Sequence, residues 1–242
     1  AATGRAASSS KGSKTARRRS WRRGCVSMID AGRYRLIRSR RRTISIDVTD
    51  EGVTVRAPYG LSEERIAAFL ESKRAWIEEK CRMRAESANA FSRVRKMETL
   101  LDAGTERPVA FGAKKDGENE GGFFLRSERS VRSYFAKMRG DALPELLYRW
   151  SRSVGEVPAD VVVRDFKARW GSCDAYRVIK LNWRLSMLPP DLRDYVLVHE
   201  LCHLKELNHS ARFWAEVERV CPEYRKNRRE LRRYSFLTAM YR

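Results

Sequence analysis

The chain has 242 residues, and its formal net charge of +20 and pI near 10.3 make it strongly basic. Hydrophobic residues make up 42% of the sequence and aromatic residues 10%, which is ordinary for a globular protein and excludes a wholly disordered chain. No apolar run approaches the roughly 18 to 20 residues that a membrane helix needs, so we expect no membrane span.

The cysteines point to a reducing environment. They are odd in number, widely spaced and without a CxxC pair, which argues against a disulfide scaffold and against a zinc site made of cysteines alone. We therefore expect a cytoplasmic location. The five are Cys25, Cys81, Cys173, Cys202 and Cys221.

Residues 1–29 form a basic tail with eight Lys and Arg residues and no acidic one. This composition cannot bury enough apolar surface to fold, so we expect a disordered tail. Nucleic-acid binding and organelle targeting are the alternatives for this segment.

Two strands and a helix are predicted next. Residues 40–48 alternate apolar and polar side chains, a turn follows at 50–52, and a return strand begins at Val53. Ser62 is a helix cap, and apolar residues at helical spacing predict one helix that runs to about residue 85. Residues 103–122 are rich in glycine and charge and predict loops with one short strand at most.

The C-terminal half alternates helices and strands. Helices are expected near 128–138 and 142–154, and strands at 161–163 and 178–184 joined by a turn at 169–174. Pro189 and Pro190 open a largely buried helix that is expected to end near residues 207–208. Ser210 caps another helix that Pro222 ends, and a last helix carries the basic stretch 225–233.

The only three histidines of the sequence lie close together. His199, Glu200 and His203 form an HExxH motif on the predicted buried helix, and residues four apart share one helix face, so both imidazoles can reach one ion. His209 follows six residues later, and a chain reversal at Leu207-Asn208 would bring it back as a third ligand.

This ligand set predicts hydrolytic zinc chemistry. Three neutral imidazoles leave Zn²⁺ with an open position, and Glu200 can take a proton from water and pass it to the leaving group. The sequence therefore predicts a zinc-dependent hydrolase, with His199, His203 and His209 as metal ligands and Glu200 as the general base.

Several motifs resemble the YgjP-like metallopeptidase family, which is of the zincin type and related to the SprT-like group. The C-terminal motifs are RWGSC (169–173), LNWRL (181–185), DYVLVHELCHL (194–204), NHSARFW (208–214) and CPEY (221–224). The N-terminal ones are YRLIRSRRRTISI (34–46), VRAP (55–58) and KRAWI (73–77). The resemblance covers nearly everything from residue 33 onward.

The resemblance implies an α+β fold with a zincin-like catalytic domain, in which the HExxH helix packs on a small mixed sheet after an N-terminal hairpin and helix. It implies the same three histidine ligands and Glu200 as base, with a peptide or protein as substrate. The expected organisation is a tail at 1–29, an α+β region at 30–127 and a catalytic region at 128–242.

Other marked residues have two interpretations each. Trp170, Gly171 and Cys173 form the turn beside the active cleft or, as we expect, hold the hairpin by packing, and Cys202 is expected to pack within its helix. Residues 181–185 form an edge strand that pairs with a peptide or a plain sheet strand. Arg169 stabilises an oxyanion or, as we expect, forms a structural ion pair.

Two other functions stay open beside the metallopeptidase. A basic chain attracts polyanions, so a metal-dependent nucleotide pyrophosphatase or phosphohydrolase is one alternative, although no GxxxxGK[ST] loop is present. The other is a nucleic-acid-associated protease that uses the basic tail and residues 225–233 to contact nucleic acid.

Overall fold

The computed structural model describes residues 34–49 and 52–241, which fall into two compact units divided between Cys81 and Arg82. The predicted tail at 1–29 lies outside the described residues. The predicted boundary at 127 stays a prediction. Within the described ranges, no helix combines the length and the apolar character needed to cross a membrane.

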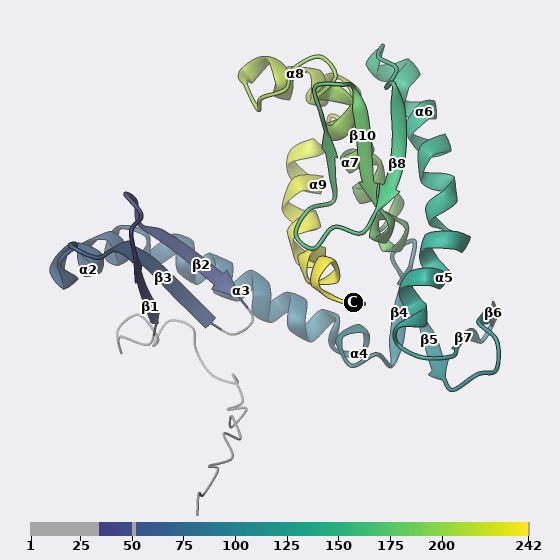
Figure 1. Ribbon diagram of the computed structural model, residues 1–242, viewed down its shortest axis with the longest axis horizontal. Coiled ribbons are helices and arrows are strands. Elements are labelled where there is room, and N and C mark those ends of the chain that lie inside the picture. The colour runs from purple at the N-terminus through teal and green to yellow at the C-terminus, as the bar shows by residue number, and fades with distance from the viewer. Residues whose placement is uncertain (1–33, 50–51, 242) are drawn as a thin grey trace, which may run out of the picture. The chain divides into compact units, whose positions relative to one another are not determined.

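The first unit is a three-stranded sheet with helices on it (Figure 1). Its strands are β1 (Arg35–Ser39), β2 (Ser45–Thr49) and β3 (Gly52–Pro58), with β3 in the centre, parallel to β1 and antiparallel to β2. Val53, Val55 and Ala57 alternate along β3 and point into the core. The prediction of two strands missed β1, because the arginine-rich segment 38–42 hides the alternation of Tyr34 and Leu36.

The helix predicted up to about residue 85 is two helices. Helix α2 (Glu63–Ser72) begins where the Ser62 side chain accepts a hydrogen bond from the backbone N–H of Arg65, as predicted. It ends at Ser72, and after the C-cap residue Lys73 the next helix, α3 (Arg74–Ala90), begins. Neither glycine nor proline marks this break, so the sequence contains no signal for it.

The second unit begins with the C-terminal part of α3, which is followed by the short helix α4 (Ser92–Arg95) and a four-stranded sheet in the order β4-β5-β7-β6. The strands are β4 (Thr99–Asp102), β5 (Thr105–Phe111), β6 (Gly117–Asn119) and β7 (Gly122–Leu125). The prediction of loops at 103–122 is therefore wrong. Arg107 pairs with Asp102 and Glu118 across the strands, so partly buried charged pairs on the strands produced the loop-like composition.

The second sheet of this unit has three strands in the order β8-β10-β9. Its strands are β8 (Asp160–Arg164), β9 (Gly171–Cys173) and β10 (Val178–Asn182), with β10 parallel to β8 and antiparallel to β9. The segment predicted as a turn at 169–174 thus contains a strand. Strand β10 lies in the centre of the sheet, which excludes the edge strand as the interpretation of 181–185. Leu181 and Asn182 lie in this plain sheet strand, and a 3₁₀ segment begins at Trp183.

Helices surround this second sheet, and most follow the prediction (Figure 1). The α-helices are α5 (Ser130–Met138), α6 (Leu143–Val154), α7 (Pro190–Cys202), α8 (Ala211–Val220) and α9 (Tyr224–Leu231). Short 3₁₀ segments are η1 (Gly140–Ala142), η2 (Trp183–Met187) and η3 (Arg232–Ala239). Helix α7 ends about one turn before the predicted position. The mixed helices and small sheets make this the expected α+β fold.

Candidate metal centre

Helix α7 holds its two histidines rigidly because most of the helix is buried. Its core residues pack against the second sheet and against α6, while His199 and His203 share one face. His203 is the C-cap residue, and its ring Nδ1 lies 3.0 Å from the Glu206 carbonyl oxygen. An Nδ1–H that donates to this carbonyl leaves the Nε2 lone pair of His203 available to a metal.

A chain reversal between α7 and α8 returns His209 to the other two histidines. Asn208 Oδ1 accepts a hydrogen bond from the backbone N–H of Ser210, and Ser210 Oγ caps α8 by accepting one from Phe213. His209 Nε2 then lies 3.1 Å from His199 Nε2. One ring nitrogen from each of the three histidines falls within 4.8 Å of the others. The structure thus brings all three predicted ligands together.

The protonation state of His199 and His203 and the spacing of the ring nitrogens both suit a metal ion. Burial, and then the neighbouring His203 and His209, lowers the pKa of His199 to about 3. Burial also lowers the pKa of His203. Both rings are therefore neutral at pH 7, as a ligand must be. Two nitrogens bound to tetrahedral zinc lie roughly 3.3 Å apart, because each bond is about 2.0 to 2.1 Å. The 3.1 Å separation fits this geometry.

Two aromatic side chains of α8 support the three rings. Phe213 is fully buried and stacks on His203 with ring centroids 4.4 Å apart, and it makes T-shaped contacts with the rings of His199 and His209. Trp214 stacks on His209 at 5.5 Å. Both aromatics belong to the NHSARFW motif (208–214), but the sequence gave no sign that they contact the histidines.

Glu200 is almost fully buried and faces strand β9. A Cβ atom at Gly171 would lie 2.8 Å from both Cγ and Oε1 of Glu200, so the carboxylate occupies space that only a glycine leaves open. Burial raises the pKa of Glu200 to about 8, and the positive charge of Arg169 acts in the opposite direction. A buried carboxyl with this pKa is a candidate proton carrier.

Comparison with known proteins agrees with this geometry. The profile of the YgjP-like metallopeptidase domain matches residues 42–234, which is most of the chain. The chain belongs to the YgjP-like metallopeptidase family. Helix α7, the returning loop and strand β9 all lie within the matched part, and no curated protein matches the chain.

Two crystal structures are similar to part of this YgjP-like chain. One is the metallopeptidase zymogen abylysin of Pyrococcus abyssi, which is 29% identical, covers 37% of this chain and 90% of its own, and has a TM-score of 0.34. The other is the metallopeptidase zymogen jannalysin of Methanocaldococcus jannaschii, which is 21% identical, covers 37% of this chain and 96% of its own, and has a TM-score of 0.31.

Cys202, Cys173 and Arg169 are further residues marked in the YgjP-like motifs. Cys202 is fully buried, and burial raises the pKa of its thiol to about 12, which fits the expected packing role. Burial, together with the charge of Glu200, raises the pKa of Cys173 to about 11. Arg169 has no carboxylate partner among the described residues and lies over the Phe166 ring, so the predicted ion pair is wrong.

The basic stretch at 225–233 is only partly a free cationic surface. Arg225 pairs with Glu218, and Arg233 pairs with Glu230. Arg228 lies over the Trp214 ring at 4.6 Å, and its charge contributes to the lowered pKa of His199. Arg228 is thus a cation beside the histidine cluster that the sequence did not single out, since it is one of many arginines in this stretch.

Proposed function

We propose that the chain is a zinc-dependent peptidase, in which His199, His203 and His209 hold one zinc ion and Glu200 is the general base. Membership of the metallopeptidase family supports the reaction class. The convergence of one ring nitrogen from each of the three histidines within 4.8 Å is the observation that carries the metal site. Imidazole ligands are typical of zinc and also bind other transition metals, and three of them leave one position open, as catalytic zinc sites do.

The proposed proton transfers depend on Glu200. Bound zinc supplies Lewis acidity, which polarises a peptide carbonyl and acidifies water. The Glu200 carboxylate accepts a proton from the attacking water while the oxygen bonds to the carbonyl carbon. The same carboxyl then gives that proton to the amine nitrogen as the C–N bond breaks. Positive charge nearby, which Arg169 already provides, favours the ionised form that starts this sequence.

The outer edge of β9, where no strand of the described residues pairs, supports a peptide as the substrate. Asn182 donates its backbone N–H to the Trp170 carbonyl, and the register pairs Ser172 with Lys180. In an antiparallel ladder these alternate residues face the partner strand, so the backbone groups of Gly171 and Cys173 face outward. An extended peptide can pair with these groups beside Glu200. The edge strand for substrate is therefore β9 rather than the predicted segment 181–185.

The contribution of Glu200 can be tested separately from metal binding. Glu200→Gln in the zinc-loaded protein is expected to lower cleavage of a peptide library at least about 10³-fold while zinc content stays unchanged. The control is Glu223→Gln, which neutralises an exposed glutamate and is expected to leave cleavage unchanged. A Glu200→Gln protein with wild-type turnover would exclude the proposed mechanism.

We also propose a cytoplasmic location. Cys173, Cys202 and Cys221 are free thiols, but Cys81 is disulfide-bonded, which goes against the expected absence of disulfides. The cysteines therefore give no support to the proposed cytoplasmic location. A nucleotide phosphohydrolase and a nucleic-acid-associated protease stay as alternatives, supported by the net charge of +20. Turnover of nucleotides instead of peptides would favour the first, and steeply salt-dependent DNA binding would favour the second.

A further inference from the structure

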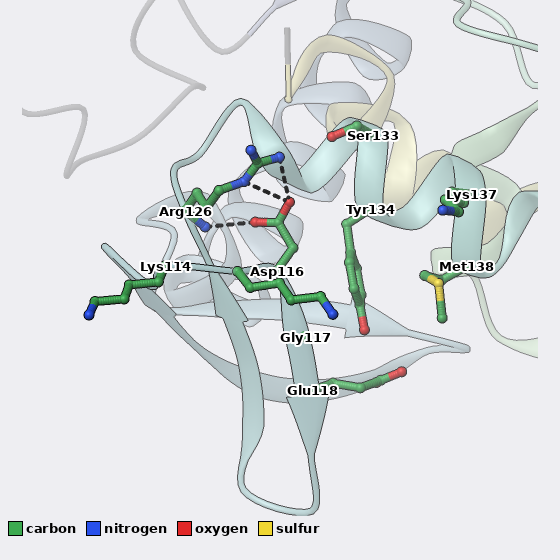
Figure 2. A pocket seen from close by; sticks show the side chains of 10 residues that line it. Lys114, Asp116, Gly117, Glu118, Arg126, Ser133, Tyr134, Lys137 and Met138 are labelled. Atoms are coloured by element: carbon green, nitrogen blue, oxygen red, sulfur yellow. Dashed lines mark hydrogen bonds and ion pairs between the residues drawn. The ribbon is translucent and has the colours of Figure 1, made fainter.

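A cavity of about 760 Å³ lies between strand β6, the segment before it and helix α5, all within the second unit. Figure 2 shows the Tyr134 side chain reaching from α5 towards the strand that carries Gly117 and Glu118. Exposed Met138 lines the same cavity and adds apolar surface. The volume is in the range of small-molecule binding sites, which is about 300 to 1,000 Å³.

The acidic side chains of this cavity are already paired with arginines. Asp116 accepts hydrogen bonds from the backbone N–H of Arg126 at 2.8 Å and from its guanidinium at 3.0 Å, as Figure 2 shows. Glu118 accepts from Arg107 at 2.7 Å and from Arg139 at 2.6 Å, and the hydrogen bonds of these arginines keep its pKa low despite burial. Neither carboxylate is therefore available to pair with the lysines of the cavity.

Three lysines provide the uncompensated charge. Lys114, Lys115 and Lys137 line the cavity, with Lys114 extending outward at its rim in Figure 2. None of the three has a hydrogen bond or an ion pair within the part of the chain that the structure describes. Three positive charges around one concave wall repel each other, and an anion between them relieves that repulsion.

The chemistry of the lining favours phosphate over carboxylate. Lysine ammonium groups are compact point charges that bind phosphate well, whereas planar carboxylates are best recognised by the fork of an unpaired arginine. The arginine of this lining, Arg126, is occupied by Asp116. A ligand with two or more phosphate groups would match several lysines at once.

We propose that this cavity binds a small molecule that carries two or more phosphate groups, at a site separate from the histidine cluster. The histidines lie on α7 and in the loop before α8, whereas β6 and β7 lie at the opposite end of this unit in Figure 1. The bound molecule therefore does not contact the proposed zinc ligands. The inference is independent of the proposed peptidase function.

Calorimetric titration of the full chain with inorganic tripolyphosphate at 150 mM salt tests this site. Lys115→Gln combined with Lys137→Gln is expected to weaken binding at least tenfold. Lys167→Gln combined with Lys226→Gln removes two exposed charges elsewhere in the same unit and is expected to change binding less than twofold. An equal loss of tripolyphosphate affinity in the two double variants would show that the anion is attracted by the net charge of the protein alone. This result would overturn the proposal.

A steric variant tests the cavity without changing any charge. Gly117 lines the cavity, and a Cβ there would meet no heavy atom within 4 Å, so Gly117→Leu can project into the space that the ligand needs. It is expected to weaken tripolyphosphate binding at least tenfold, whereas Gly60→Leu, at a similarly open glycine in the first unit, is not. Unchanged binding in Gly117→Leu would overturn the proposal.

A third titration separates a small phosphate ligand from an acidic polypeptide. Hexaglutamate carries a comparable charge on carboxylates and is expected to bind at least tenfold more weakly than tripolyphosphate. Equal or tighter binding of hexaglutamate, or no binding of tripolyphosphate at all, would contradict the proposed ligand class.

Discussion

Gly171 of strand β9 leaves the space that the Glu200 side chain occupies, since a Cβ at this glycine would lie 2.8 Å from Oε1 of the carboxylate. The two residues are 29 positions apart, in the RWGSC and HExxH motifs. The close approach fixes where the proposed general base lies. It also explains why the RWGSC motif needs a glycine at position 171, because any larger residue would displace the carboxylate of Glu200.

Gly171→Ala is therefore expected to lower peptide cleavage by about 10- to 100-fold, since a displacement of about 1 Å at a reacting group has effects of this order. Zinc content is expected to stay at the wild-type level, because the three histidines are not displaced. Gly117→Ala is the control, since a Cβ there meets open space. Full activity of Gly171→Ala, measured as kcat/KM on one peptide, would show that this contact does not position Glu200.

Phe213→Ala is expected to affect both stability and metal binding. Removal of this fully buried ring should lower the free energy of unfolding by about 3 to 5 kcal/mol. Loss of its contacts with all three histidines should also weaken zinc binding by about 10- to 100-fold. Removal of residues that orient metal ligands has effects of this size at other metal sites. Val217→Ala, at another fully buried position of α8, is expected to reduce stability alone. Urea denaturation and titration against a zinc chelator measure the two effects.

Cys173→Pro tests peptide pairing at the edge of β9. Proline removes a backbone N–H that faces the open edge, so the internal ladder is retained while one hydrogen bond to substrate is lost. We expect KM to rise roughly fivefold to tenfold, since one hydrogen bond contributes about 1 kcal/mol. Cys173→Ala removes the thiol and keeps the N–H, and it is expected to leave KM unchanged. A KM that rises equally in both variants would contradict pairing at this edge.

The pair of Asp165 with buried Arg184 predicts a dependence of stability on pH. Burial raises the pKa of Asp165, but the hydrogen bond from Arg184 and the charges of Arg184 and Arg132 lower it below its ordinary value of 3.8. A lowered pKa in the folded state stabilises the fold above pH 3.8, and this stabilisation is lost as pH falls through the folded-state pKa. Asp165→Asn should lower the free energy of unfolding at pH 7 by roughly 3 kcal/mol.

The same variant should lose less stability than the wild type between pH 5 and pH 3, because it lacks the titrating carboxylate. Thermal melts across this range measure the difference. Asp141→Asn, at an exposed aspartate, is the control and should follow the wild-type curve. Parallel curves for Asp165→Asn and the wild type would show that Asp165 does not contribute to the acid transition.

The sequence predicted best where local chemistry decides the structure. Ser62 and Ser210 cap their helices as expected, because a cap depends only on the next three residues. The four-stranded sheet of the second unit was missed, since Arg107 and Glu118 meet only after distant strands pair. The same limit applies to Gly171, whose contact with Glu200 depends on how β9 packs against α7. The spacing of the histidines predicted their convergence, whereas the aromatic contacts of Phe213 require the packed α8.

The metal content of purified protein tests the central claim most directly. Mass spectrometry of the wild type is expected to find about one zinc ion per chain. His203→Ala should lose it, and Cys202→Ala, which changes a buried residue of the same helix, should keep it. A folded wild-type protein that binds no zinc after supplementation, or a His203→Ala protein that retains it, would contradict the proposed metal centre.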